Sequence, residues 1–250
     1  MTREDTIPGT ICTRCSGKDC YPLIGTDDPL PPLDDAPAFC PMRRFPEIMD
    51  RVREEYTKPA IREFARLASI QEAQCYEIGP EGIRTKIPRL EETIEFAWKC
   101  GYTRIGIAFC VGLKEEARMV ESIFEKKGFE VISVNCKIGR VPKETIGLQG
   151  HEKIMGPALM EPMCNPIAQA EILNTEGVDL AVLLGLCVGH DTLFFRYCRV
   201  PCTVLAVKDR VFGHNPLAAL YLSKSPYYGR VNVPSNRKGS AEKIRLPDEG

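Results

Sequence analysis

The feature that most restricts the fold is an alternation of short apolar stretches with helical stretches in the second half of the chain. Apolar runs bounded by turn residues predict strands, and amphipathic segments between them predict helices. The predicted strands are 103–109, 130–135, 178–186 and 203–208, and the predicted helices are 114–127, 165–174, 191–197 and 216–222. Strands separated by helices pair in parallel through right-handed crossovers, with helices on both faces. We therefore expect an α/β domain with a mainly parallel, Rossmann-like sheet.

The segments around this domain do not show its alternation of strands and helices. Residues 1–44 contain a proline-rich acidic run and no periodicity that would build a core, whereas residues 45–77 have a helical pattern with Pro59 in a first turn. A second helix is predicted at 90–100. The expected division is a cysteine-rich metal-binding leader at 1–44, a helical segment packing on the main domain at 45–101, an α/β domain at 102–223 with a long insert at 137–163, and a polar tail at 224–250.

The insert interrupts the α/β pattern with 27 residues of no clear period. Loops longer than about 12–15 residues are usually functional or disordered. We interpret this loop as a lid over a site, and a surface excursion is the alternative. His151 lies in the insert and reaches such a site only if the loop folds over it.

Four cysteines of the leader have the spacing of a metal site: Cys12, Cys15, Cys20 and Cys40, called here the leader cysteines. A two-residue gap lets two thiolates of one turn converge on a metal, and the other two close the coordination. Cysteines in a segment without a core rarely serve packing. The leader is therefore predicted to bind one metal centre, and its spacing is compatible with zinc or with an iron–sulfur cluster.

Four more cysteines follow the predicted strands or precede a predicted helix: Cys110, Cys136, Cys164 and Cys187, called here the edge cysteines. All four are expected near the carboxyl edge of the sheet, where open α/β sheets bind ligands. Cys136 is the doubtful member, since its strand leads straight into the insert. Buried cysteines are ordinary core residues, which is the alternative. We interpret the four as a second metal or cluster site.

The same edge carries glycines and acid/base side chains. Cys-Val-Gly occurs twice, and Gly112 and Gly189 would let the backbone approach a cofactor before a helix starts. The candidate catalytic residues, which could handle protons beside a cluster, are His190, Lys208, Asp209 and His214. Structural roles are the alternatives, because aspartate often caps helices and histidine is often only hydrogen-bonded. The remaining cysteines are predicted to fill the core: Cys75, Cys100, Cys198 and Cys202.

Four motifs carry a resemblance to a known family: GIAFCVGL (106–113), MCNPIAQAEILN (163–174), GLCVGHD (185–191) and VKDRVFGHNPLAALY (207–221). With the cysteine-rich leader, they resemble the prokaryotic DUF1847 family over residues 10–222. The resemblance implies metal binding through cysteines, with no established reaction. It carries over the leader cysteines, the edge cysteines and His190 as family positions, and leaves the four other cysteines individual to this chain.

Thiolate-only ligation favours iron–sulfur clusters, one or two of them and of the 4Fe–4S type, in a protein of low-oxygen cells. The edge site would then serve redox or sulfur chemistry on a small molecule, with a redox partner protein. The first alternative is a non-enzymatic zinc protein, structural or metal-sensing. The second is a thiol enzyme with Cys187 as nucleophile beside His190.

Composition limits the partners and the compartment. Lys+Arg total 33 against 34 Asp+Glu, so charge balance does not indicate nucleic acid as a partner. The longest apolar stretch, 181–188, is far shorter than the roughly 20 residues that span a bilayer. The chain opens without the pattern of an export signal, so its twelve cysteines are expected to stay reduced or hold metal in a cytoplasmic protein.

Overall fold

The computed structural model describes residues 9–16, 20–22, 24–234 and 243–247. Parts of the leader and of the predicted polar tail therefore lie outside the described residues. The chain divides into two compact units, Met1–Lys86 and Ile87–Gly250. The boundary falls within the segment 45–101 that the sequence suggested as one helical piece.

The second unit is built on a four-stranded sheet, which confirms the predicted α/β class. Its strands are β3 (Arg104–Phe109), β4 (Glu130–Asn135), β5 (Leu180–Leu184) and β6 (Cys202–Ala206). They pair in parallel throughout, in the order β4-β3-β5-β6. The central strand β5 is buried along its whole length, as expected for a continuous apolar run covered on both sides.

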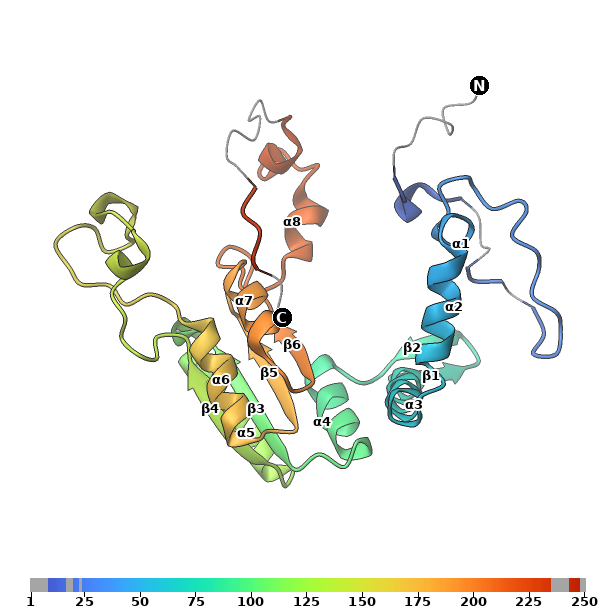
Figure 1. The fold of residues 1–250 in the computed structure, drawn as a ribbon, viewed down its shortest axis with the longest axis horizontal. Coiled ribbons are helices and arrows are strands. Elements are labelled where there is room, and N and C mark those ends of the chain that lie inside the picture. Colours follow the sequence, from blue (N-terminus) through green and yellow to red (C-terminus); the bar gives the residue numbers. More distant parts are fainter. Residues whose placement is uncertain (1–8, 17–19, 23, 235–242, 248–250) are drawn as a thin grey trace. The chain divides into compact units, whose positions relative to one another are not determined.

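Helices cover both faces of this sheet (Figure 1). On one face, α4 (Arg89–Lys99) and α5 (Lys114–Lys126) pack Ile94, Ala97 and Phe124 against β3 and β5. On the other, α6 (Pro166–Glu176) and α7 (His190–Tyr197) pack Leu173 and Phe194. Each face thus has its own apolar core, and the sheet separates them.

The strand order places a topological switch between β3 and β5. From β3 the chain crosses to β4 on one side, and after β4 it returns to β5 on the other side of β3. The two connecting helices therefore lie on opposite faces, which leaves a crevice above the carboxyl ends of the two central strands. Ligands of open parallel sheets bind at such a point, so the topology predicts a ligand site at this edge.

The first unit consists of short helices and a hairpin. A 3-10 turn at Cys12–Arg14 precedes α1 (Pro41–Arg44), α2 (Pro46–Glu55) and α3 (Pro59–Gln74), with Pro59 at the start of α3. The helical pattern predicted to run to residue 77 ends earlier, because a hairpin of β1 (Tyr76–Gly79) and β2 (Gly82–Thr85) follows. Gly82 has φ +104°, which few other residues adopt, so this turn depends on glycine.

The insert 137–163 is folded onto itself. A bridge between Pro142 and Pro162 closes its neck, and the ammonium of Lys153, only 7% exposed as a residue, pairs with Glu144 at 2.5 Å. A second ion pair joins Lys143 to Glu161 at 2.5 Å. These contacts stabilise the conformation of the insert. His151 lies exposed on its surface. The insert projects from the carboxyl edge of the sheet as an ordered excursion (Figure 1).

The last helical elements of the described residues are α8 (Leu217–Leu222) and a 3-10 turn at Gly229–Asn232. None of the helices in the described part of the chain is long and apolar enough to cross a bilayer.

Candidate functional site

The backbone brings the ends of β3, β4 and β5 into register at the carboxyl edge. The Cys110 N–H donates to the carbonyl of Leu184 at 3.1 Å, and the Cys136 N–H donates to that of Phe109 at 2.9 Å. The ladder hydrogen bonds thus continue one residue past β3 and β4, which aligns the first two edge cysteines along the sheet.

The other two edge cysteines are placed by helix starts. Asn165 caps α6 by accepting from the Ala168 N–H at 3.1 Å, and its own N–H donates to the Cys136 carbonyl at 2.8 Å. Cys164 is therefore held next to Cys136. After β5, the Cys187 carbonyl accepts from the His190 N–H at 2.9 Å, so Cys187 lies directly beneath the first turn of α7.

Three of these thiols form one hydrogen-bonded group. The Cys136 side chain hydrogen-bonds both Cys110 and Cys164, and the Val111 N–H donates to the Cys136 sulfur at 3.3 Å. Cys136, the member the sequence left in doubt, is thus at the centre of the group, and it is 2% exposed. Hydrogen bonds to its two neighbours raise the pKa of Cys136, and the same bonds lower that of Cys110 to about 5 and that of Cys164 to about 3. The hydrogen bonds therefore favour the thiolate at Cys110 and Cys164 and the thiol at Cys136.

Cations from the segment after β6 reach the same sulfurs. Lys208 hydrogen-bonds Cys110, and Arg210 donates to the Cys187 sulfur at 3.0 Å. The pKa of Arg210 is raised by this bond and by the charges of Cys187, Cys110 and Cys164. Arg210 therefore links the fourth edge cysteine electrostatically to the other three. The hydrogen bond and the positive charge of Lys208 favour the thiolate form of Cys110.

His190, the first residue of α7, is a further charged side chain next to the edge cysteines. Its side chain hydrogen-bonds Cys164, which raises the pKa of His190 and helps to lower that of Cys164. The ammonium of Lys137, which donates to the Pro162 carbonyl at 2.7 Å, adds positive charge near Cys164. Cys164 and His190 thus resemble a thiolate–imidazolium pair in their charges. His190 can therefore hold a proton beside the sulfurs.

Two of the predicted catalytic side chains serve the turn that carries the cations. The Asp209 carboxylate accepts from the N–H groups of Val211 and Phe212, both at 2.9 Å, and the Asp209 N–H donates to His214 Nδ1 at 3.1 Å. His214 has φ +66°, which the turn requires. The structure brings His190 and Lys208 to the thiols, whereas Asp209 and His214 shape the loop from which Lys208 and Arg210 extend.

The two glycines differ in what they provide. The Gly112 N–H donates to the Cys110 sulfur, and a Cβ there would lie 3.7 Å from the Lys208 ammonium, so the position has space but borders the site closely. Gly189 directly precedes α7 and has φ +86°, a value that glycine adopts without strain.

Gln169 on α6 was not anticipated from the sequence. Its amide donates to the carbonyls of Phe109 and Val134 at 3.2 and 2.7 Å, and the residue is fully buried. It thereby ties the carboxyl ends of β3 and β4 together directly below Cys110 and Cys136. A glutamine one turn after the Asn165 cap, on the inner face of a helix, was the available signal.

Replacing Gln169 with alanine should destabilise the second unit by about 2–4 kcal/mol, because the carbonyls of Phe109 and Val134 each lose a buried hydrogen bond and a cavity forms. The single tryptophan, Trp98, packs on Phe129 within this unit, so its fluorescence during urea unfolding reports the change. Gln169→Met keeps most of the volume and isolates the hydrogen bonds. If both variants unfold like the wild-type protein, the amide does not hold the strand ends.

The leader cysteines also come together, within the first unit. All four line one cavity of about 160 Å³, together with Phe39, Pro41 and Met42. The 3-10 turn brings Cys15 N–H to 3.0 Å from the Cys12 carbonyl, and Cys40 directly precedes α1. Their spacing in the sequence thus corresponds to a shared space in the fold.

Neither group has the arrangement of a preformed metal site. Within the described ranges, no set of three or more Cys, His, Asp or Glu side chains is placed as ligands of one ion. At the sheet edge, the thiols hydrogen-bond one another instead. Metal ligation there requires the loss of the central Cys136 proton, as thiolates and not thiols are ligands.

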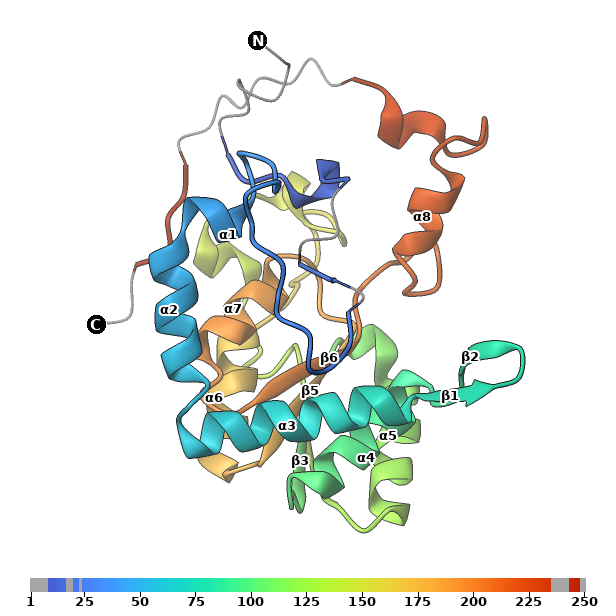
Figure 2. The same ribbon diagram turned by 90° about the vertical axis from the view of Figure 1, so that its right-hand side faces the viewer.

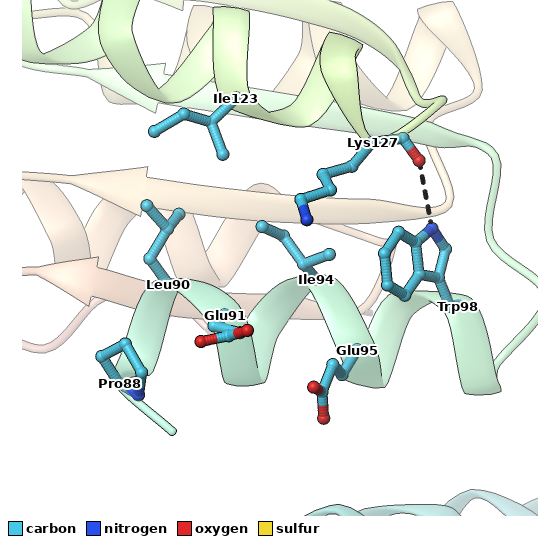
Figure 3. A pocket seen from close by; sticks show the side chains of 8 residues that line it. All are labelled: Pro88, Leu90, Glu91, Ile94, Glu95, Trp98, Ile123 and Lys127. Carbon is cyan, nitrogen blue, oxygen red and sulfur yellow. Dashed lines mark hydrogen bonds between the residues drawn. The ribbon is translucent and has the colours of Figure 1, made fainter. Parts of the chain in front are cut away.

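A separate hollow of about 270 Å³ lies between α4 and α5 (Figure 3). Leu90, Ile94 and Ile123 form its floor, and the Trp98 indole donates to the Lys127 carbonyl at 3.3 Å. No cysteine or histidine is among its lining residues, so it does not share the chemistry of the sheet edge.

Comparison with known proteins identifies the family. The sequence model of a family described as "Protein of unknown function (DUF1847)" matches residues 40–205, a range that includes Cys40 and all edge cysteines. The chain is also 39% identical over 210 residues to "Uncharacterized protein MJ0455" of Methanocaldococcus jannaschii, covering 84% of this chain and 93% of that protein. By both measures, this chain belongs to the DUF1847 family.

Proposed function

We propose that the protein is an iron–sulfur protein with two cysteine-ligated centres, one held by the leader cysteines and one by the edge cysteines. The observation that carries the proposal is the direct contact of Cys110, Cys136 and Cys164 at the switch point of a parallel sheet. A donor set of sulfur alone suits iron–sulfur clusters or zinc and disfavours hard cations.

The charges around the edge cysteines support an anionic centre. Thiolates and sulfide give a cluster net negative charge, which Lys208 and Arg210 would offset, together with His190 when it holds a proton. Four thiolates leave a net negative charge on zinc as well, so the cations support an anionic thiolate-ligated centre at this edge without selecting the metal. The iron–sulfur interpretation rests on the sulfur-only donor set drawn from separated segments of the chain.

The arrangement also supports chemistry on a small molecule. A bound cluster supplies electron transfer and, if one iron lacks a protein ligand, a position for a substrate atom. Three edge thiols form one hydrogen-bonded group, whereas Cys187 hydrogen-bonds Arg210. If Cys187 kept this bond with a cluster bound, the other three thiolates would be its protein ligands and one position would stay open to a substrate. Arg210 and Lys208 would then orient an anionic substrate, and His190 would hold the proton exchanged with it.

Anaerobic purification of the full chain, followed by visible absorption and by iron, sulfide and zinc analysis, tests the proposal. We expect a brown protein with iron and acid-labile sulfide, and a spectrum that changes when sulfide or cyanide is added. Zinc in place of iron would overturn the iron–sulfur assignment. An iron spectrum that no added ligand changes would overturn the open position and leave an electron carrier.

A further inference from the structure

Two cysteines outside the proposed centres lie together at the opposite edge of the sheet. Cys198 directly follows α7, and Cys202 is the first residue of β6. Since β6 is parallel to β3 and β5, its first residue lies at the amino edge, away from the edge cysteines. Their side chains hydrogen-bond each other, and both residues are half-buried.

The loop between the two sulfurs is firmly attached to α6. The Asn174 amide donates to the Tyr197 carbonyl at 2.8 Å and accepts from the Arg199 N–H at 2.9 Å. The Arg199 guanidinium makes two further bonds of 3.0 Å to the Glu171 carboxylate. These contacts hold the backbone on both sides of Cys198. The proximity of the sulfurs is therefore built into the fold.

We propose that Cys198 and Cys202 form a redox-active dithiol that exchanges with low-molecular-weight disulfides. The site is independent of the proposed metal centres, because it shares no side chain with them. The sequence suggested that both cysteines only fill the core. That role does not require their sulfurs to be hydrogen-bonded across a three-residue loop whose backbone is attached to α6.

The exchange proceeds in two steps that balance. The Cys202 thiolate attacks one sulfur of a disulfide RSSR, which forms a mixed disulfide and releases RS⁻. The Cys198 sulfur then attacks the Cys202 sulfur, gives its proton to the released thiolate, and displaces the second RS⁻. The two protein sulfurs lose two electrons and become one disulfide, and RSSR gains them and becomes one thiol, RSH, and one thiolate, RS⁻.

The hydrogen bond assigns the two roles. It lowers the pKa of Cys202 to about 7 and raises that of Cys198. An attacking thiol works best when its pKa is near the ambient pH, which fits Cys202. Cys198 remains protonated until the mixed disulfide forms, so it is the resolving thiol. The Cys198 sulfur also lies 3.5 Å from the Val200 carbonyl oxygen, a contact that keeps it within the loop.

The test uses the full-length protein, purified anaerobically and equilibrated with defined ratios of oxidised to reduced glutathione. Acid quenching, alkylation and peptide mass spectrometry then identify each sulfur. We expect one intramolecular disulfide, Cys198–Cys202, with the two-electron dependence of a dithiol. Free thiols at both positions in the most oxidising buffer, or pairing of either with another cysteine, would overturn the proposal.

Two variants of the dithiol and one control variant sharpen the result. Cys198→Ser keeps a hydrogen-bond donor and should stop at the mixed disulfide of Cys202 with glutathione. Cys202→Ser should form no intramolecular disulfide, whereas Cys100→Ser, a matched half-buried cysteine, should behave like the wild-type protein. Metal content should be the same in all three, so failure of the dithiol and failure of the metal centres give different results. A Cys198→Ser protein that accumulates no mixed disulfide would contradict the assigned roles.

Discussion

Cys136→Ser is expected to abolish the proposed metal centre at the carboxyl edge of the sheet, leaving only the metal proposed for the leader. The reason is its central position: it contacts both Cys110 and Cys164, and at 2% exposure no water or other side chain can easily replace its sulfur. Iron and sulfide per chain should fall by the content of one centre. Elemental analysis and visible absorption of the anaerobically purified variant measure the loss.

The matched control is Cys100→Ser. Cys100 directly follows α4 and is partly buried like the edge cysteines, but its thiol hydrogen-bonds Tyr102. It should leave the metal content unchanged. Trp98 fluorescence confirms that both variants fold, because its indole stacks on the buried Phe129 of the second unit. A folded Cys136→Ser protein with full metal content would refute the edge centre.

Cys15→Ser is expected to remove the leader centre and leave the α/β unit intact. The leader cysteines lie in the first compact unit, and the second unit has two apolar cores of its own. Structural metal in thiolate sites contributes on the order of 10 kcal/mol to the folding of small segments, so the leader should lose its structure with its metal. Metal analysis should show the loss of one centre, and limited proteolysis should cleave within residues 1–44.

The control here is Cys75→Ser, which changes a cysteine of the same unit that does not line the cavity. Its thiol donates to the Gln71 carbonyl at 3.2 Å within the C-terminal turn of α3. Unfolding followed by Trp98 should agree among Cys15→Ser, Cys75→Ser and the wild-type protein within about 0.5 kcal/mol, the usual effect of a change remote from a core. Metal content equal to that of the wild-type protein in Cys15→Ser would rule out the leader site.

The sequence predicted the α/β unit in detail because its signals are local. Apolar runs of strand length and helices with glycine or proline at their ends depend on neighbouring residues only. The four strands and the helices between them therefore lie where the pattern indicated, with ends shifted by a few residues. The hairpin Tyr76–Thr85 was missed because the preceding helical pattern extends into its first strand, and only pairing with β2 selects the extended conformation.

At the site, the sequence by itself determined which edge of the sheet carries the cysteines, because the carboxyl ends of parallel strands share one edge. Only the tertiary structure decided which sulfurs touch. It placed Cys136 at the centre, brought Arg210 to Cys187, used Asp209 and His214 for a turn, and paired Cys198 with Cys202. The physical reason is range: topology places a residue at an edge, but contact between side chains a few ångströms apart depends on loop conformations and rotamers that packing selects.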